Sequence, residues 1–154
     1  METQDRFAVE RADGARILIV AARYYKAVVD ALVTGATRAV AEAGATSEVI
    51  DIPGAFEAPA AIALAARTGR YHGYIALGCV IRGETSHYDY VCGESARGLM
   101  DLAVRDHLPI GYGILTVENQ AQAIARADPA TRDKGGEAAR ACLAVLALKK
   151  KFAT

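Results

Sequence analysis

The sequence predicts an α/β fold, a three-layer α/β/α sandwich in which helices cover both faces of a four-stranded parallel sheet. Short apolar runs rich in Ile, Leu and Val alternate along the chain with longer segments of helical periodicity. Strands that alternate with helices are joined by right-handed crossovers and run parallel. At 154 residues, 53% of them hydrophobic, the chain fits one domain with a substantial core.

The first half of the chain contains two predicted strands, each followed by a helix. Residues 16–21 form a short β-branched apolar run, and residues 26–43 then carry apolar side chains at helical spacing up to a terminating glycine. A second strand over residues 47–52 ends at a Pro-Gly pair. The helix predicted over residues 56–67 tolerates Pro59 because that proline lies in the first turn.

The second half of the chain repeats this alternation and adds one helix. An apolar strand over residues 74–81 leads through a glycine into a long helix from residue 87 to about residue 106. A proline precedes the fourth strand, residues 110–116. A short helix over residues 118–126 is broken by Asp-Pro, and the last helix covers residues 134–151.

Composition excludes several classes of protein. Lys and Arg together number 18, as do Asp and Glu, and no basic stripe with aromatics suggests nucleic-acid binding. Residues 1–14 are polar and mixed in charge, unlike a signal peptide, so we expect a tail before a domain over residues 15–154. No apolar run reaches the length of a membrane span, so we expect no membrane partner.

Cysteine and histidine spacing argues against disulfides and metals. The cysteines are widely separated in apolar segments, at Cys79, Cys92 and Cys142. They fit reduced thiols in the cytoplasm better than a disulfide framework or a CxxC site. The histidines have no metal-ligand spacing, at His72, His87 and His107, so we expect no metal.

The segment over residues 78–91 is the most informative part of the chain. A strand ends there, and a helix begins with Thr85 or Ser86 as its expected N-cap and Asp89 as partner in a capping box. The free N–H groups and positive end of such a helix suit a phosphate, and in an empty site they favour a neutral His87. Capping without a ligand, with His87 as a surface residue, remains open from these residues alone.

Parallel topology gathers four loops at one edge of the sheet, because ligands of such folds bind at the carboxyl ends of strands. These loops are residues 22–25, 53–57, 82–87 and 116–119. Tyr24 offers an aromatic face for stacking. Glu57 could accept hydrogen bonds from hydroxyl groups or simply complement a helix dipole. The backbone of residues 79–81 could bind the polar edge of a heterocycle or pair within the sheet.

The run Val80-Ile-Arg-Gly-Glu-Thr-Ser-His-Tyr-Asp89 resembles the V-I-R-G-x-T-x-H-[YF]-[DE] signature of lumazine synthase, an enzyme family of riboflavin biosynthesis. The resemblance extends from about Arg16 to Phe152 and implies a flavodoxin-like fold. It also implies condensation of 5-amino-6-(D-ribitylamino)uracil with 3,4-dihydroxy-2-butanone 4-phosphate. The products are 6,7-dimethyl-8-ribityllumazine, phosphate and water, and the reaction needs no cofactor or metal.

The resemblance assigns the site residues. It makes His87 the general acid and base, and it implies substrate contacts at Tyr24, Ala55, Phe56, Glu57, Cys79, Val80, Ile81, Glu84, Thr85, Tyr112, Arg126 and Lys134. Tyr112 would come from an adjacent subunit. Arg126 also fits a cation that complements the end of its helix, and Lys134 a surface lysine. Tyr replaces the family's frequent Phe at residues 24 and 112, and Asp133 replaces the usual Asn.

The resemblance further implies a ring of five subunits with shared sites, which some members stack into an icosahedral shell. We expect the N-terminal segment to add to a neighbouring subunit's sheet. The loop over residues 128–132 lacks the Gly-rich turn common in shell formers, which favours the pentamer. Riboflavin synthase is a candidate partner, and the expected location is cytoplasmic.

Three other classes of protein were weighed against this interpretation. A non-catalytic lumazine- or flavin-binding paralogue would lose His87 and the phosphate loop, and both are present. A purely structural shell protein would need no titratable group in that loop. A dinucleotide-binding domain would have a glycine motif after the first strand, where residues 21–25 have no glycine.

Overall fold

The computed structural model describes residues 9–153 and contains the predicted parallel sheet. Its strands are β1 (Arg16–Ala22), β2 (Thr46–Ile52), β3 (Gly73–Ile81) and β4 (Ile110–Val117). They lie in the order β2-β1-β3-β4, and every pair is parallel. The order reverses direction between β1 and β3, which makes the carboxyl ends of these two strands the switch point of the sheet.

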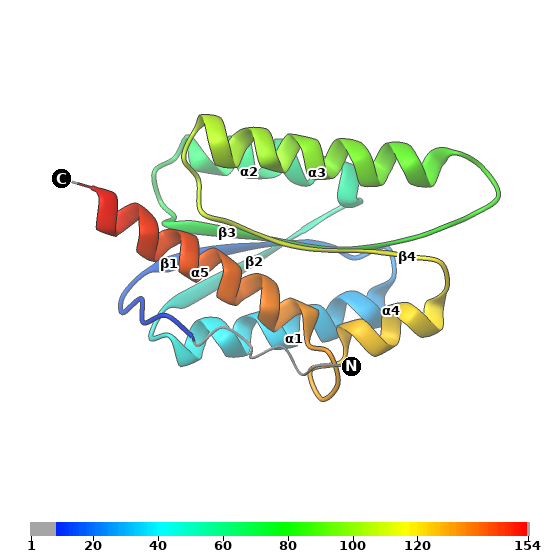
Figure 1. Ribbon diagram of the computed structural model, residues 1–154, viewed down its shortest axis with the longest axis horizontal. Helices are drawn as coiled ribbons and strands as arrows, with labels where there is room; N and C mark the ends of the chain where they lie inside the picture. Colours follow the sequence, from blue (N-terminus) through cyan, green and yellow to red (C-terminus); the bar gives the residue numbers. More distant parts are fainter. Residues whose placement is uncertain (1–8, 154) are drawn as a thin grey trace.

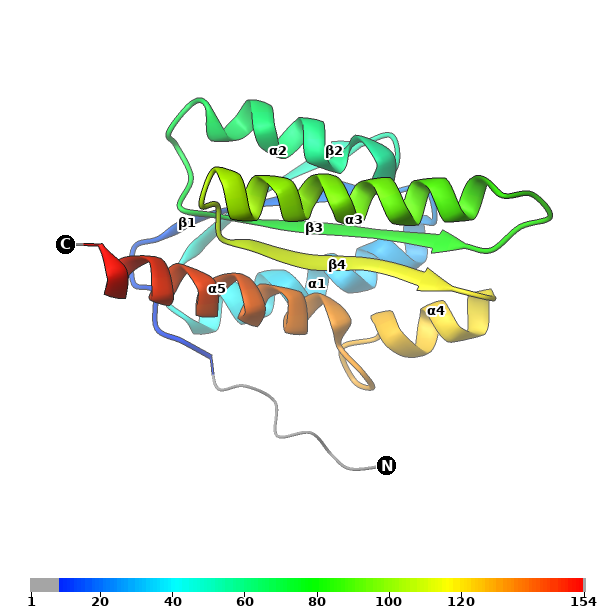
Figure 2. The ribbon, with the colours of Figure 1, turned by 45° about the horizontal axis from the view of Figure 1, so that its top comes forward.

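Helices cover both faces of the sheet, which confirms the predicted three-layer sandwich (Figure 1). The helices are α1 (Lys26–Glu42), α2 (Ala58–Ala66), α3 (His87–Arg105), α4 (Gln120–Ala127) and α5 (Lys134–Phe152). Helices α2 and α3 lie on one face, and α1, α4 and α5 lie on the other (Figure 2). A short 3-10 helix, η1 (Ala55–Glu57), precedes α2.

The core has two halves because successive strand residues point to opposite faces of the sheet. On β1, Ile17 and Ile19 pack with the buried side chains of α1 and α5, and Leu18 and Val20 pack with Ile62 and others from α2 and α3. All of β1 after Arg16 is buried. A strand buried on both faces reads as a continuous apolar run, which is the pattern seen in the sequence.

Two local predictions need correction. The helix expected over residues 56–67 is divided into η1 and α2, although its proline does lie in the first turn of α2. The capping box at Ser86 is wrong: Ser86 is the N-cap residue, but its backbone is already helical and its side chain caps nothing. Asp89 instead lies 3.6 Å from the guanidinium of Arg82.

The end of the predicted N-terminal tail lies against the domain. Ala12 is buried, and its N–H donates to the carbonyl of Ala43 at 2.9 Å. Arg11 donates to the carbonyl of Glu42 at 3.2 Å. Residues 1–8, the greater part of the tail expected to join a neighbour's sheet, are outside the described residues.

Candidate functional site

The loop after β1 presents Tyr24 to solvent on a fixed backbone. Arg23 donates to Asp51 at 2.6 Å and also pairs with Asp30, so it ties the loop to β2 and α1. Tyr25 packs edge-on against Tyr24, with ring centroids 5.0 Å apart. The Tyr24 side chain is 77% exposed. An aromatic ring that is held at its base and open on its face can receive a planar ligand.

The η1 turn lies over the carboxyl end of β3. A Cβ placed on Gly78 would lie 3.2 Å from the Cβ of Ala22 and 3.7 Å from that of Ala55, so the three backbones meet closely there. Ala55 is buried by this contact, whereas Phe56 is 56% exposed and Glu57 is exposed. The turn therefore directs Phe56 and Glu57 away from the core, at the switch point of the sheet.

The last residues of β3 extend beyond the strand next to them. Pairing with β1 ends at the pair of Ala21 and Leu77, whereas pairing with β4 continues to the pair of Ile81 and Val117. Within the described residues, the β1 side of residues 78–81 therefore has no strand partner. Its polar backbone atoms are therefore available on that side to bind the edge of a heterocycle. Burial raises the pKa of the Cys79 thiol to about 11, so this cysteine stays neutral.

The loop between β3 and α3 holds the predicted anion site. Glu84, Thr85 and His87 are all exposed, and the hydroxyl of Thr85 accepts a weak hydrogen bond from the N–H of His87 at 3.3 Å. Helix α3 begins at His87, so its free N–H groups and positive end face this loop. The arrangement provides donors for an anion beside a group that can exchange protons.

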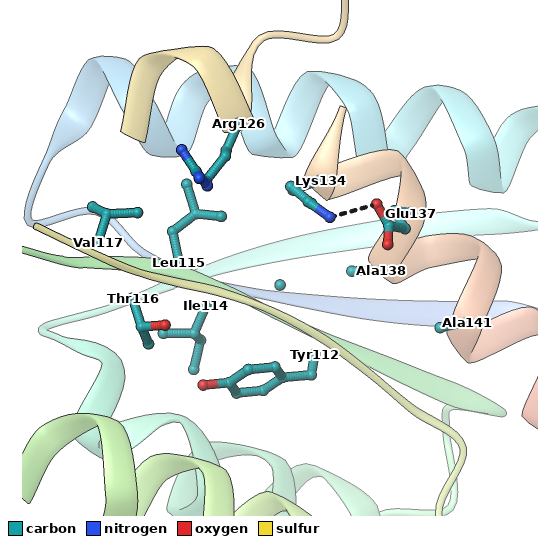
Figure 3. Close-up of a pocket in the computed structure, with 11 residues that line it drawn as sticks. Tyr112, Ile114, Leu115, Thr116, Val117, Arg126, Lys134, Glu137, Ala138 and Ala141 are labelled. Carbon is teal, nitrogen blue, oxygen red and sulfur yellow. Dashed lines mark hydrogen bonds and ion pairs between the residues drawn. The ribbon is translucent and has the colours of Figure 1, made fainter. Parts of the chain in front are cut away.

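The remaining predicted residues line a separate pocket at the outer edge of β4. This pocket has a volume of about 290 Å³ and lies between β4, α4 and α5 (Figure 3). Tyr112 projects from β4 to one side of the sheet, and Arg126 and Lys134 lie on the other side. Lys134 donates to Glu137 at 3.0 Å, and Arg126 donates to the carbonyl of Gln122 at 3.1 Å.

The predicted residues thus form two groups. The carboxyl-edge group consists of Tyr24, Ala55, Phe56, Glu57, Cys79, Val80, Ile81, Glu84, Thr85 and His87. The β4-edge group consists of Tyr112, Arg126 and Lys134. No residue of the carboxyl-edge group lines the pocket at the edge of β4. A single subunit does not bring the two groups into one cavity.

Several residues with roles in these groups were not predicted from the sequence. Glu137 is the partner of Lys134, and the spacing of three residues between them on one helix could have indicated this ion pair from the sequence. Arg23 and Arg82 hold two of the loops through ion pairs. Their partners are distant in the sequence, so no local pattern reveals them.

The described residues contain neither a metal site nor a membrane-spanning helix. Between residues 9 and 153, no group of three or more His, Cys, Asp or Glu side chains is arranged to hold a metal ion. No helix in the same part of the chain is long and apolar enough to cross a bilayer.

Comparison with known proteins gives one family. The family model described as 6,7-dimethyl-8-ribityllumazine synthase matches residues 14–150. The chain is 59% identical to the 6,7-dimethyl-8-ribityllumazine synthase of Methylobacterium radiotolerans, over 89% of this chain and 84% of the relative. It is 58% identical to the enzyme of the same name from Novosphingobium aromaticivorans, over 90% of this chain and 99% of the relative. Identity to the Bartonella henselae enzyme is 51%, over 94% of each chain.

Proposed function

The chain belongs to the 6,7-dimethyl-8-ribityllumazine synthase family, and we propose that its two groups of residues form that enzyme's site together, across a subunit interface. The chain is a transferase of riboflavin biosynthesis. It condenses 5-amino-6-(D-ribitylamino)uracil with 3,4-dihydroxy-2-butanone 4-phosphate and releases phosphate and water. We propose the following role for each of the site residues.

The pyrimidine substrate fits the switch point of the sheet. Its ring stacks on Tyr24, and its polar edge binds the unpaired backbone groups of residues 79–81. The hydroxyls of the ribityl chain reach Glu57 in the η1 turn, beside Phe56. Support comes from the exposure of these side chains and from the β1 side of β3, which lacks a strand partner there.

The phosphate of the second substrate fits the loop before α3. Backbone N–H groups at the start of α3 and the hydroxyl of Thr85 donate to its oxygens. The amine of the pyrimidine then attacks the ketone and loses water to give an imine. Phosphate leaves by elimination, and the enol that results becomes a ketone. The ribitylamino nitrogen attacks this ketone and loses a second water, which closes the ring. Each step moves a proton. His87 places an imidazole in the first turn of α3, so it accepts and returns these protons, and such transfer contributes roughly 10²–10⁴-fold to a rate.

The pairing of the arginines is the observation that points to a shared site. Near the carboxyl-edge group, Arg23 is paired with Asp51 and Asp30, and Arg82 is paired with Glu118. Both are therefore committed to carboxylates. Arg126, in contrast, has no carboxylate within 4.0 Å in the described part of the chain, and its known hydrogen bond is to a backbone carbonyl.

A neighbouring subunit can supply what one chain lacks. In a closed ring, the β4 edge of one subunit faces the carboxyl edge of the next, and each heterologous interface forms one complete site. Arg126, Lys134 and Tyr112 of the neighbour then complete the phosphate and ring contacts. We propose a homopentamer with five such sites, located in the cytoplasm, where its three free cysteines remain reduced.

Activity and the role of His87 are tested together. Purified protein is mixed with the two substrates while lumazine absorbance and phosphate release are followed, for wild type, His87→Ala and the control His107→Asn. His107 has a backbone φ of 55°, which Asn tolerates. We expect turnover in wild type and control and a collapse in His87→Ala. Unchanged turnover in His87→Ala would remove its role, and tight lumazine binding without turnover would indicate a non-catalytic paralogue.

Mixed subunits test the shared site. His87→Ala and Arg126→Ala subunits are each expected to be nearly inactive alone. In a random 1:1 co-assembly, about one quarter of interfaces pair an intact His87 with an intact Arg126, so about one quarter of wild-type activity returns. If both residues acted in one subunit's own site, mixing would restore nothing.

A further inference from the structure

Arg82 contacts both ends of the loop that precedes α3. Its backbone N–H donates to the carbonyl of Val117 at 2.9 Å and continues the β3–β4 pairing by one residue. Its Nε donates to the two carboxylate oxygens of Glu118 at 2.9 and 3.1 Å. On the far side of the loop, its Nη1 lies 3.6 Å from Asp89, and its Cζ lies 4.2 Å from the centroid of the Tyr88 ring.

The residues between these contacts have little to hold them. A Cβ on Gly83 would meet nothing within 4 Å, and the side chains of Glu84 and Ser86 are exposed. Among the described residues, the hydroxyl of Thr85 has one hydrogen-bond partner, the N–H of His87 within the same loop. The conformation of residues 83–87 therefore depends on how its two ends are joined, and the Arg82 side chain joins them.

We propose that Arg82 is a positioning residue that clasps residues 83–87 in the conformation that receives the substrate phosphate, and that it does not bind the phosphate itself. The inference rests on the proposed function of this loop. The clasp also fixes the loop to Glu118, at the start of the segment that leads into α4. It thereby links the anion loop to the helix that carries Arg126 toward the neighbouring site.

Local charge argues against direct phosphate binding by Arg82. One guanidinium faces two carboxylates, those of Glu118 and Asp89, so the cluster has a net charge of −1. The guanidinium that faces these carboxylates also stacks on the ring of Tyr88, so groups of the protein already hold it in place beside negative charge. An arginine poised for phosphate would instead keep its charge free of carboxylates, as Arg126 does within the described part of the chain.

Two roles for Arg82 predict opposite effects of a second variant. If Arg82 is a clasp, Glu118→Gln loosens the loop and weakens phosphate binding, as Arg82→Gln does. If Arg82 is a direct ligand, Glu118→Gln frees its charge and removes a repulsive carboxylate, so phosphate binds more tightly. Arg82→Lys separates the roles further, because lysine keeps the charge but cannot span Glu118 and Asp89 with a planar fork.

The matched control is Arg97→Gln. Arg97 lies on α3, is exposed, and pairs with Glu94 at 2.6 Å and Asp101 at 3.1 Å. It therefore reproduces the loss of a doubly paired surface arginine without touching the loop. Thermal unfolding of every variant shows whether the fold is kept, and the isosteric Glu118→Gln provides a test that does not depend on Arg82→Gln folding.

The experiment uses the assembled enzyme and measures three quantities: binding of inorganic phosphate by calorimetry, KM for each substrate, and kcat. For Arg82→Gln, Arg82→Lys and Glu118→Gln, we expect phosphate binding to weaken about tenfold and KM for the butanone phosphate to rise about tenfold. KM for the pyrimidine should stay within about twofold, and Arg97→Gln should match wild type.

The outcomes separate this inference from the proposed function. Wild type that neither turns over nor binds inorganic phosphate would refute the assignment of the loop, and the clasp with it. Normal wild type with an unaffected Arg82→Gln would overturn the clasp alone. Tighter phosphate binding in Glu118→Gln, or rescue by Arg82→Lys, would make Arg82 a direct ligand and overturn its positioning role.

Discussion

Gly135 provides the sharpest test of how α5 is docked. A Cβ at this position would lie 2.0 Å from the carbonyl oxygen of Leu32 and 2.7 Å from its carbonyl carbon, both in the backbone of α1. These atoms belong to a helix and cannot move independently. Ordinary contact begins at 3.4 Å, so the helices must separate by more than an ångström.

The sheet leaves α5 no free direction in which to move. A Cβ on Gly111 of β4 would lie 2.0 Å from the carbonyl oxygen of Ala138, so α5 is in close backbone contact with β4 as well as with α1. Overpacking of a close-packed core costs about 1–3 kcal/mol. For Gly135→Ala we expect the upper end, about 3 kcal/mol of the roughly 5–15 kcal/mol that stabilise a domain.

The measurement is thermal unfolding at one fixed protein concentration, because the proposed assembly would make the midpoint depend on concentration. A loss of about 3 kcal/mol corresponds to a fall of roughly 6–12 °C for a domain of this size. The control is Gly93→Ala in α3, where a Cβ meets nothing within 4 Å. That change should stabilise the helix by up to about 1 kcal/mol, because Ala has the higher helix propensity.

Activity provides a second readout for the same change. Lys134 immediately precedes Gly135 and belongs to the β4-edge group, so displacing α5 also displaces its ammonium group. We expect turnover to fall further than the unfolded fraction explains. A midpoint for Gly135→Ala equal to that of wild type, or above it, would show that the α1–α5 contact is not the constraint described.

Other predictions follow from buried or paired groups. Arg140 lies 3.7 Å from Asp133, and the two side chains are 12% and 13% exposed. Arg140→Leu leaves the Asp133 charge without its partner, so it should lower the free energy of unfolding, measured in urea, by about 3 kcal/mol. Adding Asp133→Asn should restore most of this loss, and no recovery would contradict the pairing. Burial, then the charges of Arg16 and Lys150, lower the pKa of His72 below 6.5, so stability is full above pH 6.5 and declines as pH falls toward the folded pKa. His72→Asn should reduce that decline in thermal midpoints, and an unchanged slope would refute the assignment. Burial raises the pKa of the Cys79 thiol to about 11, so little reactive thiolate is present at pH 8. Iodoacetamide at this pH should therefore modify Cys79 only after unfolding, which mass spectrometry can detect.

The sequence was sufficient to predict the elements because their periodicities are strong. Each β1 residue after Arg16 is apolar and buried, and each helix boundary agrees with the prediction to within about two residues. The 3-10 turn over residues 55–57 was missed because its apolar spacing matches that of the α-helix after it. The false capping box at Ser86 shows another limit: residue types suited to a cap do not determine the backbone angles that make one.

The positions of the candidate site residues in the fold were predictable to the extent that parallel topology determines them. The rule that strand ends meet at one edge groups Tyr24, Glu57 and Thr85 correctly. It cannot show that Tyr112, Arg126 and Lys134 line a different pocket, since that depends on which edge of the sheet β4 occupies. Only the resemblance to a known family suggested that Tyr112 acts in a neighbouring site.

The same topology is the basis for the shared site proposed above. β4 is an edge strand in the described sheet, and the pocket beside it contains Arg126, which has no carboxylate partner among residues 9–153. The anion loop before α3 has donors and His87, but its nearest arginine, Arg82, is held by Glu118. The β4 edge therefore offers the cation Arg126 but lacks His87, whereas the anion loop offers His87 and N–H donors but its arginine is already paired. In the ring proposed above, these two edges of successive subunits meet, so that the cation of one subunit faces the anion loop of the next.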